Sequence, residues 1–339
     1  MKKYLQRVML VAIAVATAQM AVAESWRINN DTSKGAHFAS INDAMASDQV
    51  KDGDVLYLDP GCVLSGNQIV KKAVTIIGTG WDFNDRPYGY AQIKGNDYFE
   101  IKAAAKIYGV YVSTELRINA NNVVVERCRI DGGVKGASYD YNKLISSYVK
   151  GPVEGRSYWE IYNCIIITSG YSDQPLKNLK NASVINCYIE KVGQPNPTLA
   201  NVSNSTFKNN VIINNSNNDY RNLIEQGCEG NTFSNNCLSA DETSTYTSTN
   251  VCANSKDVST FILNDGTVGG AAYKLCEGSP AIGVGEAGID CGPYAEGSLY
   301  PFVTYGMPKH IPYFTETSVP ARPTDGKVRV SLKIVNQND

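Results

Sequence analysis

The sequence predicts an all-β solenoid, in which short strands stack coil upon coil. Two observations lead to this prediction: a repeat of about 23 residues, and short runs rich in Val and Ile that alternate between apolar and polar positions. Composition is a third, because only 19% of the residues are charged while the chain contains 29 glycines and is rich in asparagine. Low charge and many turn-forming residues favour many short strands over helices.

The repeat is clearest around four asparagines. Asn163, Asn186, Asn209 and Asn235 follow one another at intervals of 23, 23 and 26 residues. Each has an apolar residue two positions before it and another three positions after it, which would face opposite sides of one continuous strand. Both face inward only if the chain bends between them, and Asn tolerates the left-handed backbone of such a bend. We therefore expect these asparagines to form a structural ladder, stacked ~4.8 Å apart and hydrogen-bonded to one another.

The first 23 residues have the pattern of a signal peptide. A charged start is followed by an apolar run over 8–20, and small residues precede Glu24. We expect export to the periplasm, the cell surface or the medium. No later stretch is long and apolar enough for a transmembrane segment in the mature protein.

Four regions follow from these patterns. They are a signal peptide at 1–23, an N-terminal cap at 24–55 with a short amphipathic helix near 38–46, a parallel β-helix at 56–294, and a Pro-rich extension with a terminal strand at 295–339. A cap is expected because a bare solenoid end exposes apolar core and unpaired strand edges.

Charge and cysteine content exclude several functions. The net charge of −2 becomes −5 without the signal peptide, and no Lys/Arg run is present, which argues against nucleic-acid binding. With two histidines and no CxxC pair, we expect no metal and no cofactor. Cys128, Cys164 and Cys187 each follow a bend position and are interpreted as an inward file of small side chains. Disulfides remain the alternative there and for the pairs Cys228–Cys237 and Cys252–Cys276.

The chain resembles a known family at residues 36–294. The stretch "FASINDAMASDQVKDGDVLYLDPG", the "NC" coils and the closing "SPAIGVGEAGIDCGPY" look like the pectin-lyase-like right-handed parallel β-helix proteins, especially secreted ones of Bacteroidetes. The resemblance implies three parallel sheets, with ligands lying in a groove along one of them. It specifies the activity only weakly, because the aspartate and histidine motifs of the polygalacturonases are absent.

The interval of 36 residues from Arg127 to Asn163 exceeds the repeat, and we interpret the excess as a long loop unless a coil is irregular here. Loops on a rigid scaffold favour binding, and aromatic rings stack on sugars. The candidate ligand-binding residues are Tyr139, Tyr141, Tyr158 and Trp159 in this loop, and Trp81, Tyr88 and Tyr90 in a second aromatic loop.

No catalytic set can be identified from the sequence. If the protein is an enzyme, a polysaccharide lyase is the first alternative, and Lys143, Lys150 and Arg156 are the bases available by location alone. Our leading hypothesis is an exported β-helix protein that binds a carbohydrate polymer or a cell-surface component without catalysis. A lyase or hydrolase acting on an acidic glycan, and a structural adhesin-like rod, are the two alternatives.

Overall fold

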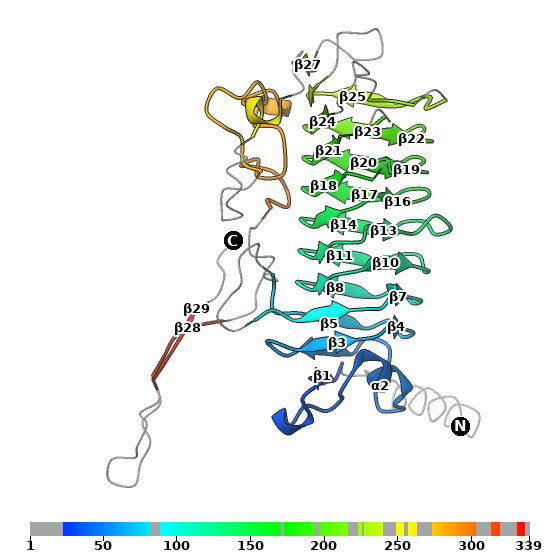
Figure 1. Ribbon diagram of the computed structural model, residues 1–339, viewed down its shortest axis with the longest axis vertical. Helices are drawn as coiled ribbons and strands as arrows, with labels where there is room; N and C mark the ends of the chain where they lie inside the picture. Colours follow the sequence, from blue (N-terminus) through cyan, green and yellow to red (C-terminus); the bar gives the residue numbers. More distant parts are fainter. Residues whose placement is uncertain are drawn as a thin grey trace, which may run out of the picture.

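The computed structural model describes residues 23–81, 89–170, 173–193, 197–215, 223–225, 227–239, 249–253, 257–262, 273–302, 313–318 and 331–335. Over most of these ranges the chain winds as a right-handed parallel β-helix, and successive strands pass in turn to three parallel sheets, here called A, B and C (Figure 1). The predicted fold class is confirmed.

The strands of each sheet are hydrogen-bonded coil to coil in parallel register. Sheet A contains β1 (Ser25–Ile28), β2 (Val55–Leu58), β5 (Thr75–Ile77), β8 (Lys106–Tyr108), β11 (Val124–Glu126), β14 (Lys143–Ile145), β17 (Glu160–Tyr162), β20 (Ser183–Ile185), β23 (Thr206–Lys208) and β25 (Thr232–Ser234). Sheet B contains β3 (Val63–Ser65), β6 (Gln92–Lys94), β9 (Tyr111–Val112), β12 (Arg129–Ile130), β15 (Tyr148–Lys150), β18 (Ile165–Thr168), β21 (Tyr188–Val192), β24 (Val211–Asn215), β26 (Cys237–Leu238) and β27 (Val251–Cys252). Sheet C contains β4 (Gln68–Val70), β7 (Tyr98–Ile101), β10 (Glu115–Ile118), β13 (Val134–Lys135), β16 (Val153–Glu154), β19 (Leu176–Lys177) and β22 (Leu199–Ala200).

The N-terminal end of the column is closed by helix α2 (Ile41–Ala46), which follows the 3₁₀ turn η1 (Thr32–Lys34) (Figure 1). Ser40 begins the helix, because its hydroxyl accepts a hydrogen bond from the Asp43 amide at 3.0 Å. The apolar face of α2 is buried and contacts β4. Strand β1 pairs with β2, so sheet A begins inside the region predicted as a cap.

Sharp bends between sheets A and B set the coil geometry. We call Arg127, Ser146, Asn163, Asn186, Asn209 and Asn235 the A–B corner row. All six have left-handed backbone, with φ between 45° and 55°. Ser146 is a bend that the sequence did not reveal, and it divides the interval from Arg127 to Asn163 into two short coils. The interpretation of that interval as a long loop was therefore wrong.

The hydrogen-bonded ladder lies one position after the corner row, not on it. The Asn210 side-chain amide donates to Asn236 Oδ1, and the Asn236 amide donates to Asn250 Oδ1, both at 2.9 Å. In earlier coils Ser147 and Cys187 occupy this position and accept hydrogen bonds from the backbone of the preceding coil. The partners in these four pairs are 19, 23, 26 and 14 residues apart in sequence, so the coil length is not constant.

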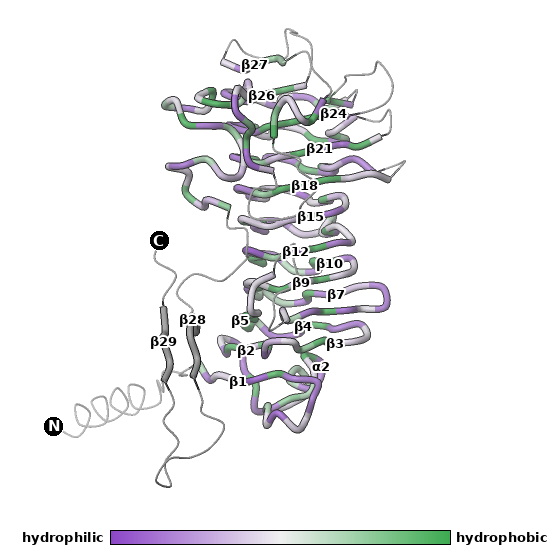
Figure 2. Tube along the Cα trace, turned by 60° about the vertical axis from the view of Figure 1, so that its left-hand side comes forward, coloured by the Kyte–Doolittle hydropathy of each residue, from purple (hydrophilic) through white to green (hydrophobic). Residues whose placement is uncertain are grey.

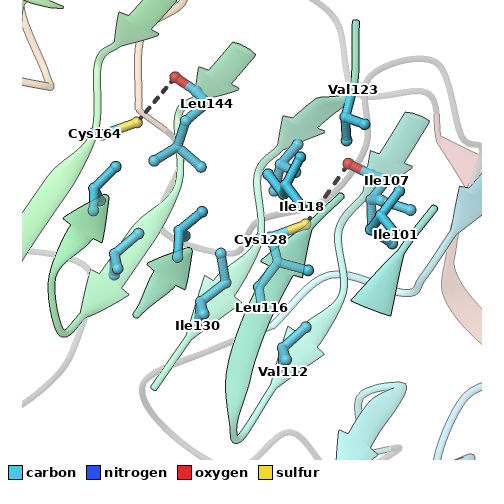
Figure 3. Packing of buried hydrophobic residues seen from close by; sticks show 14 of the residues in the cluster. Ile101, Ile107, Val112, Leu116, Ile118, Val123, Cys128, Ile130, Leu144 and Cys164 are labelled. Carbon is cyan, nitrogen blue, oxygen red and sulfur yellow. Dashed lines mark hydrogen bonds between the residues drawn. The ribbon is translucent and has the colours of Figure 1, made fainter. Parts of the chain in front are cut away.

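Cysteines also occupy the buried position that follows the A–B corner row. Cys128 and Cys164 point into the coil, where their thiols donate to the carbonyls of Ile107 and Leu144 (Figure 3). All nine cysteines belong to the described residues and all are free thiols. Burial raises the pKa of the Cys128 thiol to about 12, so it stays neutral at physiological pH. The inward-file interpretation of Cys128, Cys164 and Cys187 agrees with this arrangement, and the disulfide alternatives do not.

The solenoid ends earlier than predicted. Within the described ranges, strand β27 is the last strand of the solenoid, and residues 257–262 and 273–302 lie along the outside of sheet B (Figure 1). We call the described residues 257–262 and 273–302 the covering segment; it contains the 3₁₀ turns η2 (Val258–Thr260) and η3 (Glu286–Gly288). The described residues from 257 to 294, which were predicted to be part of the β-helix, belong to this segment. Farther on, β28 (Tyr313–Ser318) and β29 (Ser331–Val335) form a two-stranded antiparallel sheet.

We predict that Asn236→Ala lowers the free energy of unfolding by about 3–5 kcal/mol, because it leaves buried donors and acceptors of neighbouring coils unpaired. Asn236 is fully buried, and its amide also donates to the Phe207 carbonyl at 2.9 Å. Denaturant unfolding measures the loss. The control Thr232→Ala, at an exposed position of the same coil, should change stability by less than about 0.5 kcal/mol. A loss below about 1 kcal/mol for Asn236→Ala would contradict a structural role for the ladder.

Candidate functional site

Two tryptophans predicted to bind a ligand are buried, and this prediction was wrong for both. Trp159 is 1% exposed and fits beside Gly136 and Gly155, where an added Cβ would come within 3.0 Å of the indole ring. Its indole N–H donates to the Tyr139 carbonyl at 2.8 Å. Trp81 is 0% exposed, and its indole N–H donates to the Arg127 carbonyl at 2.8 Å. Both indole rings therefore belong to the protein interior.

The remaining aromatic candidates divide into two groups. Tyr139 and Tyr90 are half-buried, and Tyr90 packs edge-on against Tyr111 with ring centroids 5.2 Å apart. Tyr88 lies outside the described residues. Tyr141 and Tyr158, by contrast, are 52% and 47% exposed, and their rings stack on each other.

These two tyrosines occupy bends at the corner where sheet C passes into sheet A. We call Asn122, Tyr141, Tyr158, Asn181 and Asn204 the C–A corner row, since each has left-handed backbone with φ between 51° and 59°. Their backbone amides bond to the next coil in one continuous series. Left-handed backbone is common for Asn but is an outlier for a bulky side chain such as Tyr. The rings of Tyr141 and Tyr158 lie 5.0 Å apart with an interplanar angle of 4°.

Polar residues adjoin both tyrosines in the sequence. The Arg156 side chain, 56% exposed, lies 3.8 Å from the Asp140 carboxylate and donates to the Ser138 carbonyl at 3.1 Å. Asp140 also accepts a hydrogen bond from the Ser157 amide at 2.9 Å. The pair therefore lies in a setting that presents aromatic faces and hydrogen-bonding groups together.

The structure does not bring the three candidate bases together. Lys143 is on a strand of sheet A, Lys150 on a strand of sheet B, and Arg156 follows a strand of sheet C. The Lys143 ammonium lies 2.6 Å from the Glu160 carboxylate, which raises the pKa of Lys143 and makes it a poorer base at neutral pH. Within the described ranges, no three His, Cys, Asp or Glu side chains converge as metal ligands.

A second site lies between sheet B and the covering segment. Residues of sheet B form a second apolar core with the covering segment, and this core includes Ile165 and Tyr188. In Figure 2 the trace of β18 is coloured mostly as hydrophobic. Side chains of the A–B corner row hold the covering segment in place. The Asn163 amide donates to the Pro293 carbonyl at 2.9 Å, and the Asn235 amide donates to the Val284 carbonyl at 3.2 Å.

Glu190 on β21 lies beneath this cover and is 6% exposed. Its carboxylate accepts hydrogen bonds from the Tyr188 hydroxyl at 2.8 Å and the Asn215 amide at 3.5 Å. Burial nevertheless raises the pKa of Glu190 above its ordinary value. The sequence does not single out Glu190. The segment that covers it shows no repeat, so its place over sheet B could not be inferred.

With this geometry, the three parallel sheets define the class of the protein as a right-handed parallel β-helix. Comparisons with protein-family models, with curated proteins and with solved structures find no match to the chain. In the part of the chain that the structure describes, no helix has the length and hydropathy needed to cross a membrane.

We predict that Glu190 makes stability depend on pH. Because the folded state raises its pKa above the ordinary 4.5, the folded state binds a proton more tightly, and stability falls as the pH rises through 4.5 toward the raised value. Glu190→Gln removes this titration. The neighbouring Tyr188 and Tyr273 do not interfere, because burial raises the pKa of both.

Denaturant unfolding from pH 4 to pH 7 tests this effect. The free energy of unfolding of Glu190→Gln minus that of the wild type should become more positive as the pH rises. Asp257, whose pKa is lowered by hydrogen bonds from Ser259, titrates in both proteins and cancels in the difference. A difference that stays constant, or that falls with pH, would show that burial does not destabilise the ionised Glu190.

Proposed function

We propose that this protein is an exported β-helix protein that binds a carbohydrate polymer, and that Tyr141 and Tyr158 form its binding surface. The signal-peptide pattern and the resemblance to the pectin-lyase-like proteins support export and a polysaccharide ligand. The single observation that carries the proposal is an exposed, stacked tyrosine pair at two left-handed bends.

Backbone strain argues that these tyrosines serve more than the fold. Left-handed backbone costs roughly 1–2 kcal/mol for most L-residues, whereas Asn and Gly accept it more readily. Asn occupies the same bend in the coils on either side, at Asn122 and Asn181. A strained conformation that a simple replacement would relieve is a marker of function.

The rings themselves suit a sugar ligand. Tyrosine presents an apolar face and a hydroxyl, and it loses little side-chain entropy on binding because it has only two rotatable bonds. The stacked arrangement restrains both rings before any ligand arrives. Arg156 and Asp140 beside the pair supply groups that hydrogen-bond sugar hydroxyls. The coils continue on both sides, so the surface suits an extended polymer.

The lyase alternative has less support. Its candidate bases lie on different sheets, and Lys143 and Arg156 are each paired with a carboxylate. Proton abstraction requires a base within hydrogen-bonding reach of the substrate, together with a group that stabilises the developing negative charge. The adhesin-like rod remains the alternative if no glycan binds.

Replacing both tyrosines with the residue of their neighbours gives a direct test. The variant Tyr141→Asn/Tyr158→Asn keeps the left-handed bends and relieves their strain, which offsets the lost ring stacking, so its free energy of unfolding should not fall more than about 1 kcal/mol below that of the wild type. Its affinity for any polysaccharide that the wild type binds should fall at least ~10-fold, or about 1.4 kcal/mol. Affinity electrophoresis against neutral and acidic polysaccharides measures the binding.

The control is Tyr57→Thr, which removes an exposed tyrosine from a strand of sheet A far from the pair and should leave binding unchanged. Wild-type affinity in the double asparagine variant would refute the role of the tyrosines. Failure of the wild type to bind any polysaccharide would instead support the rod.

A further inference from the structure

A cavity of about 450 Å³ lies between part of the outer face of sheet B and the covering segment. Ile167, Glu190 and Asn215 line it from the sheet, on three successive strands. Val258, Ile262 and Tyr273 line it from the covering segment. Its size falls in the range of small-molecule sites, roughly 300–1,000 Å³.

Glu190 is out of place in this wall unless it serves a ligand. The equivalent positions on the adjacent strands are Ile167 and Ile213, both apolar. Among the described residues, no Lys, Arg or His forms an ion pair with Glu190. Burying a carboxyl group without a cation is costly, and an apolar residue there would continue the core. A polar group kept at such a cost inside a cavity indicates a binding site.

The lining also indicates the class of ligand. Asp257 is a second acidic residue of the wall, and none of the described lining residues carries a positive charge. An anionic ligand would meet repulsion from these carboxylates. The wall combines an aromatic ring and aliphatic side chains with the hydrogen-bonding groups of Glu190 and Asn215. This combination matches a pyranose, which has an apolar C–H face and a rim of hydroxyls.

We propose that this cavity binds one neutral sugar residue, with Tyr273 against its C–H face and Glu190 and Asn215 hydrogen-bonded to its hydroxyls. The site is separate from the tyrosine pair, which lies at the corner between sheets C and A. The two proposals therefore fail independently.

The test is a calorimetric titration of the full chain with glucose, galactose and mannose, and with glucuronate and galacturonate as anionic counterparts. At least one neutral sugar should bind with a dissociation constant below ~10 mM, and its uronate should bind at least ~10-fold more weakly. Glu190→Gln should reduce this discrimination, because it removes a negative charge and keeps a hydrogen-bonding group of the same shape.

Two further variants localise the binding. Ile167→Trp fills the cavity and Asn215→Ala removes a hydrogen-bonding group, and each should weaken sugar binding at least ~10-fold. Thermal unfolding followed by circular dichroism verifies that each variant is folded. If Ile167→Trp does not fold, Asn215→Ala alone tests whether the cavity binds the sugar. Tyr141→Asn/Tyr158→Asn should bind the monosaccharide like the wild type.

Three results would overturn the proposal: no neutral sugar bound below ~10 mM, equal affinity for the uronates, or wild-type affinity in both folded cavity variants. Loss of polymer binding alone would refute only the function proposed for Tyr141 and Tyr158.

Discussion

The sharp bend between sheets A and B is the constraint on which the rest of this molecule depends. Each coil reverses direction within a few residues, and it does so with left-handed backbone at the same position in successive coils. Because the bends are alike, the strands remain in register and the next residue always points into the core. That inward position needs an acceptor for a backbone amide, which explains why Ser147, Cys187, Asn210 and Asn236 occupy it.

The outer side of the same bends holds the covering segment. Asn163 and Asn235 donate to its carbonyls, while Asn209 Oδ1 accepts from the Glu286 amide at 2.9 Å. Lys208 reinforces the contact through an ion pair with Glu286. The segment thereby covers the hydrophobic outer face of sheet B and closes the cavity around Glu190. One backbone conformation thus supports the inner ladder, the second core and the wall of a candidate site.

The fold could be predicted because asparagine marks most of the bends, but the same reliance on asparagine caused the main error. Ser146 makes the same bend, and its flanking residues Leu144 and Val149 have the expected spacing, yet a serine does not stand out. Trp159 then seemed to lie in a loop and is in fact core. The cavity could not be predicted, because contacts such as Asn163–Pro293 join residues 130 positions apart that share no pattern. Among the candidate ligand-binding residues that the structure describes, only Tyr141 and Tyr158 are exposed.

Hydrogen exchange in Asn209→Gly tests most directly whether the A–B corner row holds the covering segment. Glycine keeps the left-handed bend but removes the side chain that accepts from Glu286. The amides of Glu286 and its neighbours in the covering segment should exchange at least ~10-fold faster than in the wild type, while the strand amides of Val211 and Cys237 keep their protection. Unchanged exchange in the covering segment, or a general loss of protection in the strands, would contradict the claim that one row of bends organises both the coils and their cover.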